Sequence, residues 1–244
     1  MKQLILLFTG LFLAVSLPAQ NKGRVSNKRQ FADLAGTVGS NRGTAALSYV
    51  HNWKIGRKQR WEAGIGARFT SSFGIKQQFT TAPAKLARTS TTPFLIVFAG
   101  QATANWDTLT VQRPWANALN LTANFAYNFN SVWSAGFNID LIGFAFGRKS
   151  AAVLTSNGIT RTEPAATVSH FNALLTGDLD YGNLNSEFFI KYQLNQQWAI
   201  RGVYQFLFNE YKTASIKQIA PDGTEVDRFR NKANNVGLAV TYQF

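Results

Sequence analysis

The feature that most constrains this chain is an alternation of apolar and polar residues that persists for about ten positions at a time. In the segment NALNLTANFAYNF, every second residue is apolar: Leu119, Leu121, Ala123, Phe125 and Tyr127. The residues between them, which form the other parity, are mostly asparagine. A period of two is typical of a β-strand whose two faces meet different surroundings. Similar runs recur at 44–53, 60–70, 131–143, 186–194, 198–208 and 234–244. The sequence therefore predicts an all-β fold.

The length of these runs favours a membrane-spanning barrel. A strand that crosses a bilayer needs ~9–11 tilted residues, with lipid-facing and lumen-facing positions alternating. Strands of soluble sandwiches are mostly ~5–6 residues long. The polar parity also carries glycines, asparagines and charges, as an enclosed lumen does. At the level of the fold, the alternative is a soluble periplasmic β-sandwich or a lipocalin-like carrier.

The amino terminus has the layout of a secretory signal peptide. Met1 and Lys2 precede the apolar run LILLFTGLFLAVSL, and the small residue Ala19 follows it. The run is too short for a comfortable membrane span, so we expect cleavage after Ala19 and treat an uncleaved helical anchor as the alternative. The predicted organisation is a signal peptide, a basic periplasmic lead-in and a barrel domain, at 1–19, 20–29 and 30–244.

Charge and composition limit the binding partners and the catalytic groups that this chain can have. The chain carries 25 basic and 12 acidic residues, a formal net charge of +13. Export makes nucleic acid an unreachable partner, so we expect the basic surface to meet anionic lipid or lipopolysaccharide. The absence of cysteine excludes disulfides and thiol catalysis, and we expect neither a cofactor nor a metal ion.

Three very short connections set the expected orientation. They are KIGRKQ after Trp53, NS before Val132, and NQQ before Trp198. Bacterial barrels have short periplasmic turns, long external loops and aromatic girdles at both membrane interfaces. Four of the six tryptophans flank these turns. We therefore predict a periplasmic girdle of Trp53, Trp61, Trp133, Trp198 and Phe244.

The strand count follows from these turns. Six strands are joined by the three turns, the carboxy-terminal strand is a seventh, and an even number is usual. The eighth is expected in RQFADLAGTV, with Asp33 and Thr37 facing inward. The sequence thus predicts an eight-stranded antiparallel up-and-down transmembrane β-barrel. Extended external hairpins are expected in the long connections, at 72–116, 147–183 and around Pro221-Asp222-Gly223, with Asn157-Gly158 as a hairpin turn.

The signal peptide, the periodic strands, the NQQW turn and the terminal VGLAVTYQF together resemble the small bacterial outer-membrane β-barrel superfamily of OmpX-like and OmpA-barrel-like proteins. The resemblance implies a monomeric integral protein of the outer membrane. It also implies that Phe244 is read by the barrel-assembly machinery. Members of the superfamily include adhesins, complement-resistance proteins, enzymes and narrow pores. The resemblance therefore predicts a location and a fold, and no particular activity.

The inward parity carries four acidic and four basic side chains. They are Asp33, Arg60, Glu62, Arg68, Asp140, Glu187, Lys191 and Arg201. Eight strands enclose a space that side chains can fill, and buried charges are tolerated when they are paired. We therefore predict a lumen plugged by paired charges, in a protein with a structural or surface-interaction role. A narrow passive pore lined by the same charges is the alternative.

Basic residues near the predicted external interface are candidates for lipopolysaccharide contact through charge-assisted hydrogen bonds to phosphate. They are Arg148, Lys149, Arg228, Arg230 and Lys232. Ordinary solvated loop charges are the equally weighted alternative.

Two further patterns are compared with known chemistry. Ser169 and His170 evoke lipid A-modifying outer-membrane enzymes, but neighbours on a strand point to opposite faces and no carboxylate has a convincing spacing. We therefore expect no enzymatic activity and keep a lipid A-modifying enzyme as the alternative. The segment GDLDYGN departs from the EF-hand pattern, since its glycine comes fifth, and a turn is the favoured interpretation.

Overall fold

The computed structural model of the 244-residue chain describes residues 28–92 and 95–244. The predicted signal peptide and most of the basic lead-in lie outside the described residues. None of the described helices is long and apolar enough to span a membrane.

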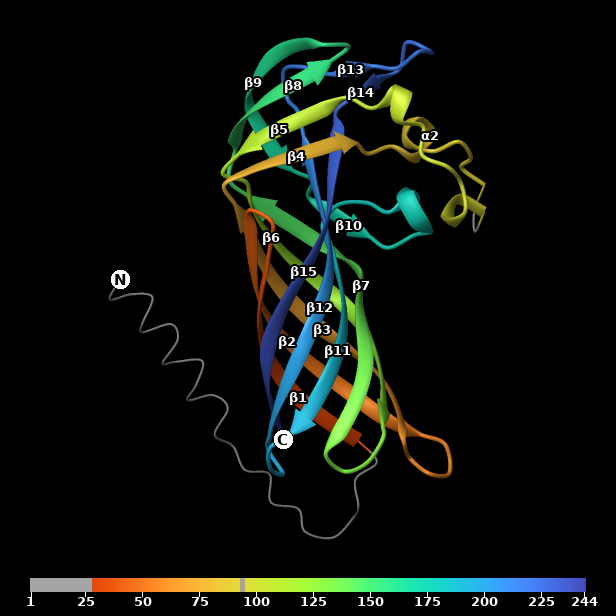
Figure 1. The fold of residues 1–244 in the computed structure, drawn as a ribbon, viewed down its shortest axis with the longest axis vertical. Coiled ribbons are helices and arrows are strands. Elements are labelled where there is room, and N and C mark those ends of the chain that lie inside the picture. Colours follow the sequence, from red (N-terminus) through yellow and green to blue (C-terminus); the bar gives the residue numbers. More distant parts are fainter. Residues whose placement is uncertain (1–27, 93–94) are drawn as a thin grey trace, which may run out of the picture.

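Long antiparallel strands of 10 to 16 residues form the wall of the molecule (Figure 1). They coincide with the alternating runs of the sequence, and the least apolar of those runs, RQFADLAGTV, forms the first strand. The wall strands are β1 (Lys28–Gly39), β2 (Arg42–Ile55), β3 (Trp61–Gly74), β6 (Trp115–Asn128), β7 (Trp133–Gly147), β11 (Leu184–Gln193), β12 (Trp198–Lys212) and β15 (Arg228–Gln243).

The sheet closes on itself. Each wall strand pairs with the next along the chain, and β15 returns to β1 in a ladder that includes Asp33 opposite Thr241. One circuit continues from β12 through β9, β8, β5 and β4 to β15, which makes a ring of about twelve strands. A direct ladder between β12 and β15 closes a shorter circuit below those four strands. The prediction of an antiparallel all-β fold that closes into a ring is therefore confirmed.

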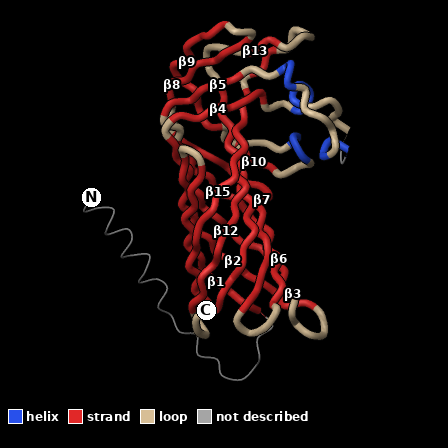
Figure 2. The backbone as a smooth tube through the Cα atoms, viewed as in Figure 1, coloured by secondary structure: helices blue, strands red, loops and turns tan. Residues whose placement is uncertain are grey.

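The long connections build an external part at the upper end of the wall (Figures 1 and 2). It holds the strands β4 (Lys76–Thr81), β5 (Thr108–Gln112), β8 (Ser150–Ser156), β9 (Ile159–Val168), β10 (Phe171–Ala173), β13 (Gln218–Ile219) and β14 (Glu225–Val226). The helical turns gather at the same end, namely α2 (Ala84–Ala87), η1 (Leu95–Val97), η2 (Thr103–Asn105) and η3 (Gly177–Leu179).

The expected hairpin between β8 and β9 turns on Asn157 and Gly158, which have φ angles of 49° and 78°. Two successive positive φ angles match the right-handed twist of the flanking strands, and asparagine and glycine tolerate them. The long connection from 75 to 114 contains the short helix α2 and the expected hairpin, β4 with β5. The external strands thus continue the ring beyond the wall.

The three short turns lie together at the opposite end, beside the carboxy terminus (Figure 1). Phe244 is fixed there, because its backbone N–H donates to the carbonyl of Gln30 at 3.0 Å. The two ends of the wall therefore differ, with tight turns at one and an elaborate external part at the other.

Candidate functional site

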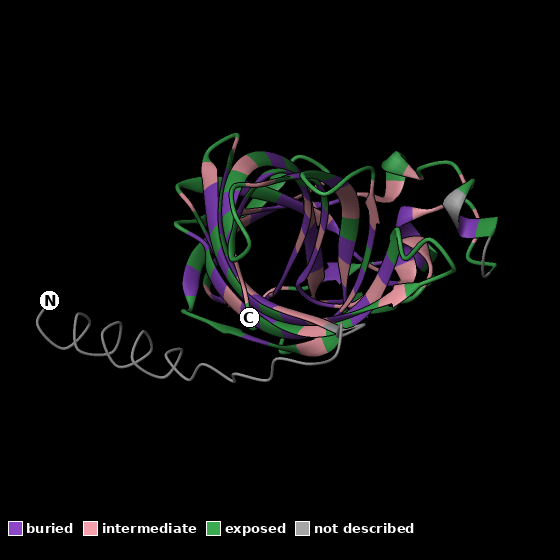
Figure 3. Cartoon of the chain, turned by 90° about the horizontal axis from the view of Figure 1, so that it is seen from below, coloured by how far each residue is buried: buried purple, intermediate pink, exposed green. Residues whose placement is uncertain are grey.

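The outer face of the wall is apolar and exposed. On β3 the exposed large side chains are Trp61, Ile65, Phe69 and Phe73, while most of the alternate positions are buried inside. Twelve residue steps separate the first from the last, which is ~40 Å along a strand and ~30 Å after a tilt of ~40°. This height equals the thickness of the hydrocarbon core of a bilayer. Figure 3 shows buried and exposed bands alternating along strands around the ring.

The five predicted girdle residues lie at the end that carries the short turns. All five are exposed: Trp53, Trp61, Trp133, Trp198 and Phe244. Three of these tryptophans each pack on a tyrosine of the neighbouring strand, with ring centroids 4.7, 4.8 and 4.9 Å apart. The tyrosine partners Tyr127, Tyr192 and Tyr242 were not predicted as girdle residues, although all three lie on the outward parity. The result is a belt of amphipathic rings at one edge of the apolar surface.

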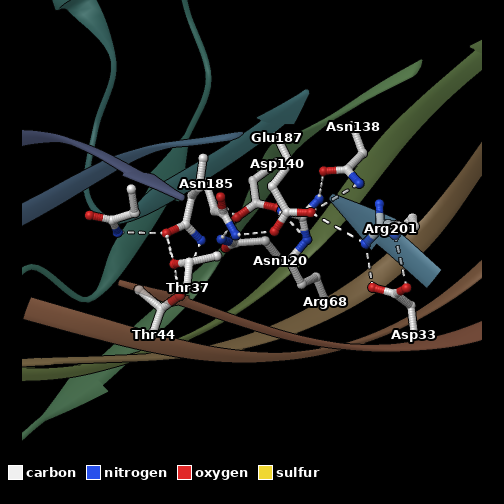
Figure 4. Close-up of polar contacts among 12 residues, drawn as sticks. Asp33, Thr37, Thr44, Arg68, Asn120, Asn138, Asp140, Asn185, Glu187 and Arg201 are labelled. Carbon is white, nitrogen blue, oxygen red and sulfur yellow. Dashed lines mark hydrogen bonds and ion pairs between the residues drawn. The ribbon is translucent and has the colours of Figure 1, made fainter. Parts of the chain in front are cut away.

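The inner face carries a network of buried ion pairs (Figure 4). Arg201 on β12 donates through Nε to Asp33 Oδ1 of β1 at 3.0 Å, and its NH2 group binds the second carboxylate oxygen. Thr241 on β15 donates its hydroxyl to the same carboxylate at 2.7 Å. Arg201 also lies 3.5 Å from Glu187 of β11. Asp33 therefore connects strands that are far apart in sequence, and it is almost completely buried.

Arg68 on β3 is the second centre of this network. Its guanidinium lies 3.2 Å from Glu187 and 3.5 Å from Asp140, and it donates to the Asn138 side chain. Asn120 donates to Asp140 at 2.7 Å, and Asn185 donates to Glu187 at 3.1 Å. The amides supply the remaining hydrogen bonds that buried carboxylates need. Pairs and amides thus cross-link the lumen between opposite walls.

A third group lies nearer the short turns. Glu62 pairs with Arg29 at 3.3 Å and accepts hydrogen bonds from two asparagine side chains. Lys191 is buried nearby and lies 5.9 Å from the centre of the Phe31 ring. Arg60 was predicted to join the lumen, but it lies in the exposed turn before β3, so that prediction is wrong. Arg29 pairs with Glu62 instead, since it lies on β1 at the same parity as Asp33.

Polar and then apolar side chains fill the ring above the charges. Gln205 accepts hydrogen bonds from Thr37 at 2.6 Å and Asn235 at 2.7 Å. The next layer is an apolar cluster that includes Phe79, Leu109, Leu154, Tyr211 and Phe229. Cavities of about 90 and 10 Å³ lie, respectively, at the short-turn mouth and beside Asp140. Among the described residues, a polar layer and then an apolar cluster therefore lie above the ion pairs inside the ring.

The predicted lipopolysaccharide contacts separate into two places. Arg148 and Lys149 are exposed at the turn between β7 and β8, where Arg148 donates to the carbonyl of Arg113. The other three, Arg228, Arg230 and Lys232, lie on the upper part of β15. Arg228 binds Glu210 through two hydrogen bonds of 2.9 and 2.8 Å, and Arg230 lies 3.1 Å from the same carboxylate.

Asp178 of the GDLDYGN segment is surrounded by cations. It accepts hydrogen bonds from Arg88 and Lys232, and Arg230 lies 3.8 Å away. Burial alone would raise the pKa of Asp178, but these hydrogen bonds outweigh burial and lower its pKa below the usual range. Asp180 caps the backbone N–H of Leu175 at 2.7 Å. The segment is a turn, as favoured from the sequence, and its first carboxylate holds basic side chains.

Ser169 and His170 do not form a catalytic pair in the described structure. Ser169 is fully buried and its hydroxyl has no hydrogen-bond partner among the described residues. His170 is exposed, and its Nδ1 lies 3.1 Å from the carbonyl oxygen of Ala145. The Ser169 side chain is buried and the His170 side chain is exposed, in the connection between β9 and β10.

Comparisons with known proteins bear on the fold. No family model matches the chain, and no curated protein matches its sequence. Solved structures of small outer-membrane β-barrels do match it. Neisserial surface protein A matches with a TM-score of 0.37 and 9% identity, over 90% of this chain and 98% of that one.

Two further structures match over similar lengths. The attachment invasion locus protein Ail of Yersinia pestis has a TM-score of 0.38 and 10% identity, over 90% of this chain and 100% of its own. A major outer membrane protein from Thermus thermophilus has a TM-score of 0.39 and 11% identity, with the same coverage. At these low scores the likeness concerns the fold, and the function is inferred below from the geometry of this chain.

Proposed function

We propose that this chain is an integral protein of the bacterial outer membrane, a barrel of eight transmembrane strands with a structural or surface-interaction role. The observation that carries the proposal is the inversion of the usual burial pattern. The outer face of the wall is apolar and exposed, whereas the inner face holds charges and amides that are almost completely buried. Such a molecule would expose a very large apolar surface to water, and lipid is the solvent that matches it.

The orientation follows from the two ends of the wall. Short turns and an aromatic girdle are typical of the periplasmic side, and long connections of the external side. The external part is thus available to the surroundings of the cell. We propose outer-membrane lipid and lipopolysaccharide as its partners, with the barrel-assembly machinery during biogenesis, and no nucleic acid. We also propose that the barrel is a monomer.

The packing of the lumen supports a plug. Asp33, Arg68, Glu187 and Arg201 form a continuous chain of ion pairs across the interior. An apolar cluster closes the ring above them. We therefore propose that the lumen does not conduct ions. Discrete conductance steps in planar bilayers that change in a Glu62→Gln variant would overturn the plug and leave the membrane location intact.

The separation of Ser169 from His170 supports a role without catalysis. We expect the mass spectrum of lipid A to be the same with and without expression of the protein. A new lipid A species that disappears in His170→Ala would contradict this expectation.

Membrane location is tested by fractionation and by electrophoresis. Folded outer-membrane barrels migrate differently on gels before and after boiling, so we expect a heat-modifiable band in the outer-membrane fraction. Recovery of the protein in the soluble periplasmic fraction, with no change of mobility on boiling, would refute the proposal.

A further inference from the structure

A cleft of about 640 Å³ opens on the external part. It is bordered by the turn between β1 and β2, by β4 and the α2 region, by η3 and by the upper part of β15, which lie near one another in Figure 1. Four cations but only one carboxylate line the cleft, namely Arg42, Lys76, Arg230, Lys232 and Asp178. The lining is therefore strongly positive, and an anion is the ligand that it favours.

Two of the four cations lack a carboxylate partner. Among the described residues, the side chain of Lys76 makes no hydrogen bond or ion pair, and Arg42 binds only the side chain of Asn231 and the carbonyl of Ser40. The terminal nitrogens of Arg230 bind two carbonyls and the carboxylate of Glu210, but its buried Nε has no hydrogen-bond partner in the described part of the chain. A phosphate group supplies the acceptor oxygens that these donors lack.

The neutral lining indicates what carries the phosphate. Gln77 is buried in the cleft wall, and its side-chain oxygen accepts no hydrogen bond from any described residue. Gln78, Gln101 and Asn41 add further amides, and Trp106 is the aromatic side chain of the lining. Amides suit the hydroxyl groups of a sugar, and an indole suits its apolar face. The combination fits a phosphorylated sugar better than a free inorganic ion.

The cleft also lies close to the apolar belt. Val38 and Val236 are the uppermost outward apolar residues of β1 and β15, and they face each other in the ladder. Ser40 and Lys232 line the cleft two and four residues further along, which is ~7–13 Å at ~3.3 Å per residue. Head groups of the outer leaflet lie at this height above the hydrocarbon core.

We propose that this cleft is a binding site for a phosphate-bearing saccharide. The proposal rests on the proposed function, since the external part must face outward for the cleft to meet such a ligand. Arg42, Lys76 and Arg230 bind the phosphate oxygens. Gln77 accepts from a sugar hydroxyl, and Trp106 packs on the ring.

The test uses the full barrel folded into phospholipid vesicles, with calorimetric titration. The soluble probe is the deacylated, phosphorylated saccharide of lipopolysaccharide; its dephosphorylated form and inorganic phosphate are compared with it. We expect saturable binding of the phosphorylated saccharide alone. Equal affinity for the dephosphorylated form, or for inorganic phosphate, would overturn the proposal.

The cleft variant is Arg42→Gln with Lys76→Gln. Its affinity should fall about tenfold or more, since charge-assisted hydrogen bonds to phosphate are the strong ones. The control, Lys85→Gln with Lys217→Gln, removes two exposed external cations that pair with Asp222 and Glu225 outside the cleft. It should bind as the unchanged protein does. Equal losses in both variants would reduce the effect to net charge and overturn the site.

The experiment distinguishes an error in the proposed binding site from an error in the proposed function. The unchanged protein and each variant are first checked for the heat-modifiable band. Unchanged protein that inserts but does not bind the phosphorylated saccharide counts against the cleft alone. Lys76→Gln by itself removes a side chain without described contacts, so it tests the site even where the double variant does not fold. An unchanged affinity in Lys76→Gln would contradict the proposal.

A second set of titrations distinguishes soluble saccharide from a lipid head group as the ligand. Vesicles that contain intact lipopolysaccharide present the same head group in the membrane plane. Binding of both forms, lost in Lys76→Gln, supports a site open to soluble and lipid-borne saccharide. Binding of the lipid-borne form alone, with the same loss, supports a lipid head group as the ligand. Binding of neither form overturns the proposal.

Discussion

Replacing Arg201 with methionine tests the plugged lumen. The substitution keeps an unbranched side chain and removes the guanidinium, which leaves Asp33 without its ion-pair partner, while Glu187 keeps Arg68 at 3.2 Å. Asp33 is only 1% exposed, and Arg201 supplies two of its hydrogen bonds. Removing one partner of a buried pair costs about 3–5 kcal/mol, since the remaining charge is uncompensated. We expect Arg201→Met to lower the free energy of unfolding by this amount.

The assay is unfolding by urea of the protein folded into lipid vesicles, with the midpoint and slope compared between variants. The matched control is Lys212→Met on the same strand, because Lys212 and Asp227 form a partly exposed pair at 3.9 Å. An exposed pair contributes about 0–1 kcal/mol. The double variant Asp33→Val with Arg201→Met should recover most of the loss, since it removes both charges. If Arg201→Met costs no more than Lys212→Met, water solvates Asp33 and the lumen is not plugged.

Three further predictions concern the external part and the closing ladder. Because the pKa of Asp178 is lowered, its ionised form stabilises the fold above about pH 4, and this stabilisation is lost as the pH falls through the lowered pKa. Protease resistance of the external part should therefore decline at that acidic pH. The Asp178→Asn variant should show no such decline. Burial raises the pKa of Asp107, so its ionised form is disfavoured in the fold; Asp107→Asn should increase protease resistance at neutral pH and have no effect well below pH 4. A Cβ atom at Gly237 would lie 2.0 Å from the carbonyl oxygen of Gly36, so Gly237→Val should give no heat-modifiable band, whereas Gly36→Ala, which meets nothing within 4 Å, should fold.

The wall could be predicted from the sequence because its strands follow a strict period of two. Few structures besides a membrane-spanning strand require a period of two over ten residues, and the tight turns with their tryptophans fix which strands are neighbours. Even the weakly apolar run at 29–38 was predicted to be a strand, with Asp33 and Thr37 on its inward face. The register then decides which charges face inward, and seven of the eight predicted lumen residues are on the inner face.

The contacts of the external part could not be predicted from the alternation of apolar and polar residues. Arg60 was misplaced because β3 begins at Trp61, one residue later than predicted. The alternation of side chains between two faces holds only within a strand, so it does not predict the direction of a side chain just outside one. Arg230 and Lys232 were predicted to be near the external interface, but nothing in their spacing indicated that η3 would cover them with Asp178. Contacts of this kind join residues about 50 positions apart through irregular backbone. Local periodicity carries no information about them.

In the proposed arrangement, the outer face of the ring meets lipid. The chain has no cysteine, so a single cysteine carrying a spin label can be placed in turn at 236–241 on β15. Accessibility to oxygen, which partitions into lipid, is compared with accessibility to a water-soluble nickel chelate. We expect high oxygen and low chelate accessibility at Val236, Leu238 and Val240, and low values of both at the alternate positions. High chelate accessibility at Leu238 in the vesicle-bound protein would contradict this arrangement.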